Sequence, residues 1–219
     1  MAKLKKVVPA ILAEDPKALE AMVREAESFA SYVQFDIMDG KFVPSRSITS
    51  QDLMAVPVKF NWEAHLMVER PEDYLNDFRE AGAKKVVFHY EAMSSPQSVI
   101  SQARELGLEV GLAINPETDV PAFLPLVDEV DSVLFLTVHP GFYGSKFIPE
   151  VLDKIIELRQ SRPSVAIGAD GGIKESNIIQ IAHKGVDEFC VGSAIFSQPK
   201  PDERYYHFMA LIKEVSSPD

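Results

Sequence analysis

Three side chains that can move protons or bind a metal stand in or directly after short apolar runs. Asp36 lies within residues 32–38 and His65 within residues 60–68, while Asp170 follows a third run. Read with a period of two, Asp36 and His65 each fall on the polar side of a strand whose other side is apolar. We therefore expect two carboxylates and one imidazole to face a common interior and share one site.

Two carboxylates on opposite sides of a ligand suit stereochemical inversion at a carbon acid. One removes a proton next to a carbonyl, and the other returns a proton to the opposite face of the planar enediolate. We expect Asp36 and Asp170 to form this pair. A divalent metal bound by both carboxylates and His65 would stabilise the charge on the enediolate oxygens.

Several of these residues also have a purely structural interpretation. A hydrogen-bonded core histidine is the alternative for His65, although the face it shares with Asp36 favours a metal ligand. Met38 and Met67 would shield the enediolate with apolar walls, and core packing is the alternative for both. For three further polar residues, a solvated loop is favoured at least as much as substrate contact: His89, Glu91 and His139.

The elements that must position this site alternate between β-rich runs and helical patterns. The expected strands are residues 6–12, 32–38, 60–68, 84–89, 109–114, 132–138, 165–170 and 188–191. The expected helices are residues 16–29, 71–81, 97–106, 120–127, 149–161, 175–183 and 202–215, with a weak pattern at 50–55. Eight such units favour a single (β/α)8 TIM barrel over an open doubly wound sheet. The open sheet would carry a glycine-rich nucleotide turn after the first strand, where residues 12–16 contain no glycine.

Glycines instead gather after the sixth, seventh and eighth expected strands. Backbone amides at glycines can approach an anion closely, so late-strand glycines in a barrel indicate a phosphate cradle. Tight turns are the alternative for any single pair. The candidate phosphate and substrate residues are Gly141, Phe142, Gly144, Gly171, Gly172, Gly192 and Ser193.

Composition limits the partners. The 219 residues are 46% hydrophobic and carry a net charge of −11, which fits one domain over residues 1–219 and argues against nucleic acid or a membrane surface as the main partner. No apolar run approaches the roughly 18 residues of a membrane span, and the first residues lack a signal-peptide core, so a cytoplasmic location is expected. The single cysteine, Cys190, predicts a buried thiol without a role.

Motifs along nearly the whole chain make it resemble the ribulose-phosphate 3-epimerase family. They are Pro9-Ala10-Ile11-Leu12, Asp36-Ile37-Met38-Asp39-Gly40, Phe42-Val43-Pro44, His65-Leu66-Met67-Val68, Thr137-Val138 with Pro140-Gly141-Phe142, Asp170-Gly171-Gly172 and Gly192-Ser193-Ala194-Ile195. The resemblance implies a barrel of the ribulose-phosphate-binding type, usually oligomeric, that interconverts ribulose 5-phosphate and xylulose 5-phosphate with a divalent metal (Zn, Mn, Fe or Co).

The resemblance also implies a role for each matching residue. Asp36 and Asp170 would be the acid/base pair and metal ligands, with His65 as a further ligand. Gly141, Gly144, Gly172, Gly192 and Ser193 would lie at the substrate phosphate.

The sequence departs from the family pattern at the barrel mouth. A second metal-binding histidine is replaced by Gln34, whose carbonyl oxygen is a weaker ligand for zinc than imidazole. This change predicts a weakened metal site in which Gln34 is a doubtful fourth ligand. The other departures are Ala10 for serine, Lys41 for histidine, Ser45 for asparagine, Leu136 for methionine and Gly168 for glutamate.

Three functions fit this pattern. The first is an active epimerase with an altered metal site, acting on ribulose 5-phosphate or a close ketose phosphate. The second is a degenerate member that binds a phosphorylated ligand without catalysis, but retention of both aspartates and His65 favours the first. The third is a lyase on a related barrel, such as a hexulose-phosphate synthase or a nucleotide decarboxylase. Those enzymes carry Asp-x-Lys-x-x-Asp, and the nearest string here begins at Asp15 and has the pattern of a helix start.

Overall fold

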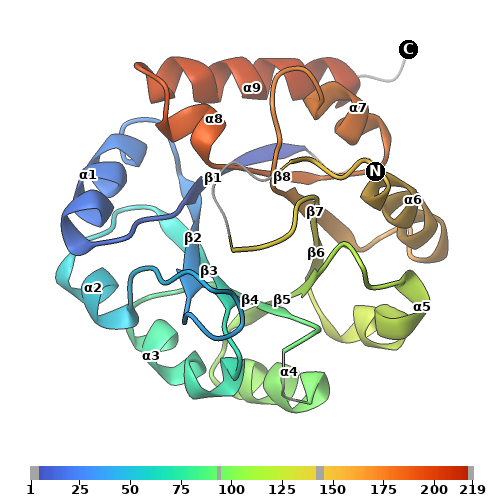
Figure 1. Ribbon diagram of the computed structural model, residues 1–219, viewed down its shortest axis with the longest axis horizontal. Helices are drawn as coiled ribbons and strands as arrows, with labels where there is room; N and C mark the ends of the chain where they lie inside the picture. The colour runs from blue at the N-terminus through green and yellow to red at the C-terminus, as the bar shows by residue number, and fades with distance from the viewer. Residues whose placement is uncertain (1–4, 93–94, 142–145, 217–219) are drawn as a thin grey trace.

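The computed structural model describes residues 5–92, 95–141 and 146–216. Within this part of the chain, eight parallel strands close into a barrel in which β8 pairs with β1 (Figure 1). The strands are β1 (Lys6–Ile11), β2 (Tyr32–Met38), β3 (Asn61–Met67), β4 (Lys85–His89), β5 (Glu109–Ile114), β6 (Ser132–Leu136), β7 (Ala166–Asp170) and β8 (Glu188–Val191). The TIM barrel expected from the sequence is confirmed, and the open doubly wound sheet is excluded.

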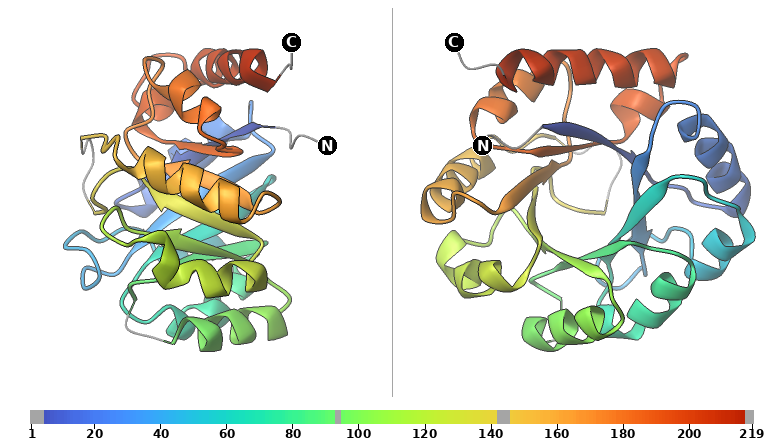
Figure 2. Two further views of the ribbon diagram at one scale, coloured as in Figure 1. Left: turned by 90° about the vertical axis from the view of Figure 1, so that its right-hand side faces the viewer. Right: turned by 180° about the vertical axis from the view of Figure 1, so that it is seen from behind.

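Helices surround the strands as an outer ring (Figures 1 and 2). They are α1 (Pro16–Ala26), α2 (Ser50–Ala55), η1 (Pro71–Asp73), α3 (Leu75–Glu80), α4 (Pro96–Glu105), α5 (Val120–Phe123), η2 (Leu124–Glu129), α6 (Val151–Ser161), α7 (Ile178–His183), α8 (Ser193–Phe196) and α9 (Pro201–Ser216), where η marks a 3-10 helix. Among the described residues, none of these helices combines the length and apolar character needed to cross a bilayer.

Two expected helices, residues 71–81 and 120–127, are each divided between 3-10 and α-helical geometry. In the second, Pro125 has no amide proton and cannot donate to the carbonyl four residues earlier, so α-helical hydrogen bonding stops there. Both changes occur on the outer ring and leave the strands in place.

Helix α1 begins directly after an N-cap residue, Asp15. The side chain of Asp15 accepts a hydrogen bond of 2.8 Å from the amide of Ala18, and Pro16 occupies the first turn. Asp15 is therefore a helix cap, as its sequence context predicts. Gly82, Gly107 and Gly185 follow the ends of α3, α4 and α7 and adopt positive φ angles, which favour glycine.

The alternation along β2 separates a packed outer layer from the barrel interior. Val33, Phe35 and Ile37 are buried in the main core cluster. Gln34 and Asp36 fall on the opposite, inward side of the strand. The apolar residues hold the strand against the helices, so the inward polar residues are presented at fixed positions.

Candidate active site

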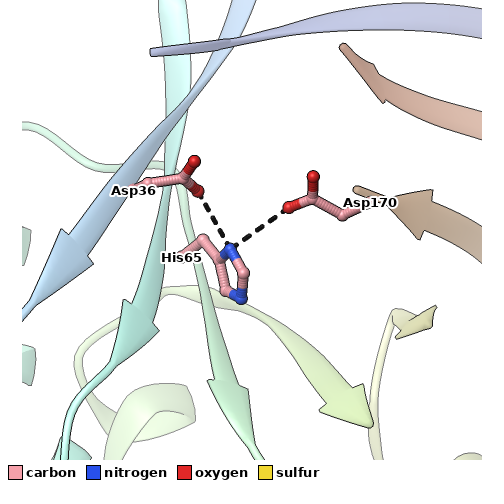
Figure 3. Close-up of side chains that lie close together, drawn as sticks. All are labelled: Asp36, His65 and Asp170. Carbon is pink, nitrogen blue, oxygen red and sulfur yellow. Dashed lines mark hydrogen bonds and ion pairs between the residues drawn. The ribbon is translucent and has the colours of Figure 1, made fainter. Parts of the chain in front are cut away.

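Asp36, His65 and Asp170 converge near the carboxyl-terminal ends of β2, β3 and β7 (Figure 3). The register places Asp36 beside His65, and Asp170 approaches from the other side of the mouth. His65 Nδ1 lies 3.0 Å from Asp36 Oδ1 and 3.4 Å from Asp170 Oδ2. One ligand atom from each residue lies within 4.8 Å of the others, so the structure brings together the three side chains singled out in the sequence.

Gln34, two residues before Asp36 on β2, completes this cluster and is fully buried. Its Nε2 donates hydrogen bonds to Asp36 Oδ1 at 3.0 Å and Asp170 Oδ2 at 2.8 Å, and it lies 3.5 Å from His65 Nδ1. Its Oε1 accepts a hydrogen bond of 3.2 Å from the thiol of Cys190. The amide nitrogen, rather than the carbonyl oxygen, therefore faces the candidate ligands.

Burial and proximity shift the titration of the cluster. Burial raises the pKa of the Asp36 carboxyl above its usual range, opposed by the hydrogen bond from His65, and the charge of Asp170 adds to the rise. Burial by itself would lower the pKa of His65, but hydrogen bonds to Asp170 and Asp36 outweigh it and raise this pKa to about 10. In the absence of a metal, the two carboxylates therefore favour the protonated form of the His65 imidazole.

The cluster opens into a pocket at the barrel mouth. Its lining includes the two methionines expected as apolar walls, Met38 and Met67, together with Lys174 at the rim. The candidate phosphate residues that line it are Gly141, Gly171, Gly172, Gly192 and Ser193. The expected residues Phe142 and Gly144 lie outside the described part of the chain.

Gly171 shows why glycine is needed in this rim. Its φ of +107° is rarely adopted by other residues, and a Cβ at this position would overlap Val138 Cγ2. A side chain would therefore push apart the turns that follow β6 and β7, at the edge of the pocket.

Comparison with known proteins agrees with this geometry. The model of the ribulose-phosphate 3 epimerase family matches residues 6–196. The chain belongs to the ribulose-phosphate 3-epimerase family. It is 35% identical over 204 residues to a ribulose-phosphate 3-epimerase of Schizosaccharomyces pombe, covering 90% of each chain. It is 36% identical over 222 residues to the enzyme of that name from Synechocystis, covering 97% of this chain and 95% of the relative.

Solved structures with much lower identity share the barrel. A KGPDC from Streptococcus mutans has a TM-score of 0.73 at 13% identity, with 98% of this chain and 100% of that chain covered. A 3-hexulose-6-phosphate synthase from Salmonella typhimurium has a TM-score of 0.72 at 19% identity, with 95% and 99% covered. At such identities the likeness shows the fold alone.

The donor atoms of this family member fit a divalent metal. Two carboxylate oxygens and one imidazole nitrogen form a set of three protein ligands, which is typical of catalytic metal sites that leave a position for substrate. The orientation of the Gln34 amide does not add a fourth ligand, because an amide nitrogen donates hydrogen bonds and offers no lone pair.

His89 is a site component that the sequence left undecided. Its side chain is fully buried, and its Nε2 lies 3.0 Å from His65 Nε2, behind the cluster. His89 Nδ1 lies 3.6 Å from Glu91 Oε2, while Glu91 Oε1 accepts hydrogen bonds from the amide of Asn115 and the hydroxyl of Thr118. Neither His89 Nδ1 nor Glu91 Oε2 has a hydrogen-bond partner among the described residues. With its proton on Nδ1, facing this carboxylate, a neutral His89 would accept at Nε2 from His65. A neutral His65 would then keep Nδ1 free for a metal.

The period-two alternation along β4 could have placed His89 in the barrel interior from the sequence alone. Lys85, Val87 and His89 alternate on one side of the strand, and that side is the barrel interior. His139, by contrast, is exposed and pairs with exposed Glu117 at 2.7 Å, so it belongs to the solvated loop.

Four of the five other departures from the family pattern fit their surroundings through local contacts. Ser45 Oγ donates a 2.6 Å hydrogen bond to the carbonyl of Gly141, which joins two loops at the rim. A Cβ on Gly168 would lie 2.7 Å from Leu134 Cδ1. The Leu134 side chain therefore fills the space that a side chain at position 168 would need. Ala10 and Leu136 line the pocket as small and apolar residues.

Proposed function

We propose that this chain is an isomerase that interconverts D-ribulose 5-phosphate and D-xylulose 5-phosphate, or a closely related ketose phosphate pair. The observation that carries the proposal is the convergence of two carboxylates from β2 and β7 with His65 at the mouth. Membership of the family and relatives named ribulose-phosphate 3-epimerase support the same activity.

In this proposal Asp36 and Asp170 carry out the proton transfers at C3. The side chain of each is 13% exposed, so both reach the pocket while remaining largely shielded from water. One carboxylate removes the C3 proton, and the other protonates the opposite face of the enediolate. The reverse reaction exchanges the two roles, so one site serves both directions.

The residues around the two bases would stabilise the negative charge that develops on the enediolate oxygens. Asp36, His65 and Asp170 would hold a divalent metal, of which Zn, Mn, Fe and Co are candidates, and that metal would supply positive charge to the enediolate oxygens. Met38 and Met67 are 6% and 5% exposed. Their apolar side chains would exclude water from the planar intermediate.

The far side of the pocket provides the proposed phosphate site. Gly171, Gly172, Gly192 and Ser193 border it, and α8 begins at Ser193. A phosphate held by the turns after β7 and β8 and by a short extra helix is common in TIM barrels. Lys174 adds a cation to this rim. This arrangement would fix the ketose with C3 between the two carboxylates.

The proposal is tested by proton NMR of ribulose 5-phosphate mixed with purified protein, with and without Zn²⁺ or Mn²⁺. Formation of xylulose 5-phosphate is expected. If ribulose 5-phosphate is not turned over under any metal condition, other pentulose and hexulose phosphates follow. Failure with all of them, together with retained binding of a ketose phosphate, would favour the non-catalytic alternative.

A further inference from the structure

Four polar atoms, here called the shell, lie close together where β2, β3 and β7 meet. Three are the candidate ligand atoms of Asp36, His65 and Asp170, and the fourth is Nε2 of Gln34, which lies 2.8 to 3.5 Å from each of them. Gln34 is fully buried. In this orientation its two amide protons serve the two carboxylates, and no lone pair points at the centre of the shell.

Cys190 adds to the preference for this orientation of the amide, which the two carboxylates already favour because each accepts one of its protons. The residue is 3% exposed, and its thiol is a weak hydrogen-bond donor. Its Sγ donates to Oε1 of Gln34 at 3.2 Å. If the amide turned by half a rotation, Oε1 would enter the shell and the NH2 group would face sulfur, which is only a weak acceptor.

We propose that Gln34 is a two-position amide, held in the donor position by both carboxylates and by Cys190 in the metal-free protein and turned to present Oε1 when a divalent cation binds. The inference rests on the proposed metal site and does not require turnover. In the donor position, Gln34 holds Asp36 and Asp170 together without a metal. Cys190 is a positioning residue that lowers cation affinity without touching the cation.

The first test is calorimetric titration of metal-free protein with Zn²⁺ alone. Cys190→Ala removes the thiol donor and is expected to tighten zinc binding about fivefold, the equivalent of one net hydrogen bond. Val191→Ala is the matched control, because Val191 is equally buried in the same strand but belongs to the outer core cluster. It should lower the melting temperature and leave zinc affinity within about twofold of the wild type.

A double-mutant cycle isolates the amide. Gln34→Met keeps the length of the side chain but has neither donor nor acceptor oxygen. Adding Cys190→Ala to Gln34→Met should leave zinc affinity unchanged, because no amide remains to be set. An equal gain from Cys190→Ala in both backgrounds would overturn the proposal, as would no gain in the wild-type background.

A spectroscopic test needs no substitution at Cys190 and covers the case in which that variant does not fold. The side-chain NH2 signals of Gln34 are assigned in ¹⁵N-labelled protein by their absence in Gln34→Met. Zinc is expected to shift both proton signals as they leave the carboxylates. Signals that stay unchanged at zinc saturation would contradict the turn, and failure of zinc to bind wild-type protein and Gln34→His alike would remove the metal site itself. Epimerase activity is measured separately and stands or falls by the NMR assay of turnover.

Discussion

At the scale of single residues, Gln34 links the two carboxylates of the site through its side-chain amide. Its amide adds two hydrogen-bond donors between Asp36 and Asp170, where two buried negative charges would otherwise repel each other. His65 adds an imidazole between the same two oxygens. The carboxylates are therefore held in place by uncharged and ionisable donors from neighbouring strands.

Replacing either proposed base tests its role. Asp36→Asn and Asp170→Asn are each expected to reduce turnover at least about 1,000-fold, because each removes a proposed proton-transfer group and a proposed metal ligand. The fold should persist, because asparagine has nearly the same shape. Turnover is followed by NMR and the fold by circular dichroism. Activity close to the wild type in either variant would rule out the two-base mechanism.

Individual residues explain what the sequence could and could not predict about the site. The alternation in β2 and β3 predicted that Asp36 and His65 share a face, because period two is enforced by backbone geometry. The bond from Cys190 to Gln34 joins residues 156 positions apart. Nothing local in the sequence specifies such a contact, since it depends on the closure of β8 against β1.

At the scale of elements, half-buried carboxylates join strand ends to the loops that follow them. Asp39 is an example. Its Oδ1 accepts hydrogen bonds from the amides of Lys41 and Phe42, and its Oδ2 accepts one of 2.8 Å from the amide of Glu69. It thereby ties the loop after β2 to the loop after β3, beside the pocket.

The stability that Asp39 contributes by joining these two loops depends on pH. Partial burial of Asp39 opposes ionisation, but the backbone hydrogen bonds outweigh it and hold its pKa below the ordinary value. Its stabilisation is therefore complete above the unfolded-state pKa of about 4 and is lost as the pH falls through the lower folded-state pKa.

Asp39→Asn is expected to lower the free energy of unfolding by about 1–3 kcal/mol at pH 7, because the amide cannot accept with both side-chain atoms. The difference from the wild type should shrink below about pH 4. Urea unfolding at several pH values measures it, with exposed Asp73→Asn as the control. A difference that stays constant down to pH 2 would contradict this account.

Hydrogen bonds between the loop after β4 and the loop after β5 lead to a second prediction at this scale. Glu91 is fixed by Asn115 and Thr118 and lies behind His89. Glu91→Gln should lower zinc affinity about tenfold by relaxing the tautomer of His89 and hence of His65. Glu117→Gln, an exposed glutamate on the same side of the barrel, should leave affinity unchanged. Equal effects of the two variants in calorimetry, or unaltered imidazole ¹⁵N shifts in Glu91→Gln, would refute this positioning role.

At the scale of the whole molecule, the candidate site lies at the carboxyl-terminal end of the barrel, and a buried ion pair fills the interior toward the other end, here called the floor. Lys85 Nζ lies 2.9 Å from Glu63 Oε2, and the same oxygen accepts a 2.9 Å hydrogen bond from the hydroxyl of Tyr32. The side chains of Lys85 and Glu63 are 6% and 2% exposed. These inward residues belong to the amino-terminal parts of the strands, away from the mouth.

Lys85→Met should cost about 3–5 kcal/mol of stability, because it leaves the charge of Glu63 buried without its partner. Lys6→Met is the control, since Lys6 is 41% exposed in its ion pair with Glu188 and should cost less than about 1 kcal/mol. Unfolding in urea gives both values. Turnover per folded molecule should be unaffected in both variants, and a selective loss of turnover in Lys85→Met would show that floor and mouth are coupled.

The fold of the whole molecule was more predictable than its assembly. Eight alternating units fix the number of strands, and the barrel closes because each strand needs a partner on both edges. The homo-oligomer and the cytoplasmic location expected from the sequence remain predictions, the former open to measurement by sedimentation.

The central claim is that two carboxylates act on opposite faces of C3. The most direct measurement is epimerisation of ribulose 5-phosphate in D2O, with the isotope at C3 of the first xylulose 5-phosphate formed read by NMR and mass spectrometry. Two bases predict one solvent-derived deuterium at C3 in each product molecule, since the proton removed by one carboxylate is not the one delivered by the other. Product that retains the substrate's own C3 proton would contradict the claim and indicate a single base.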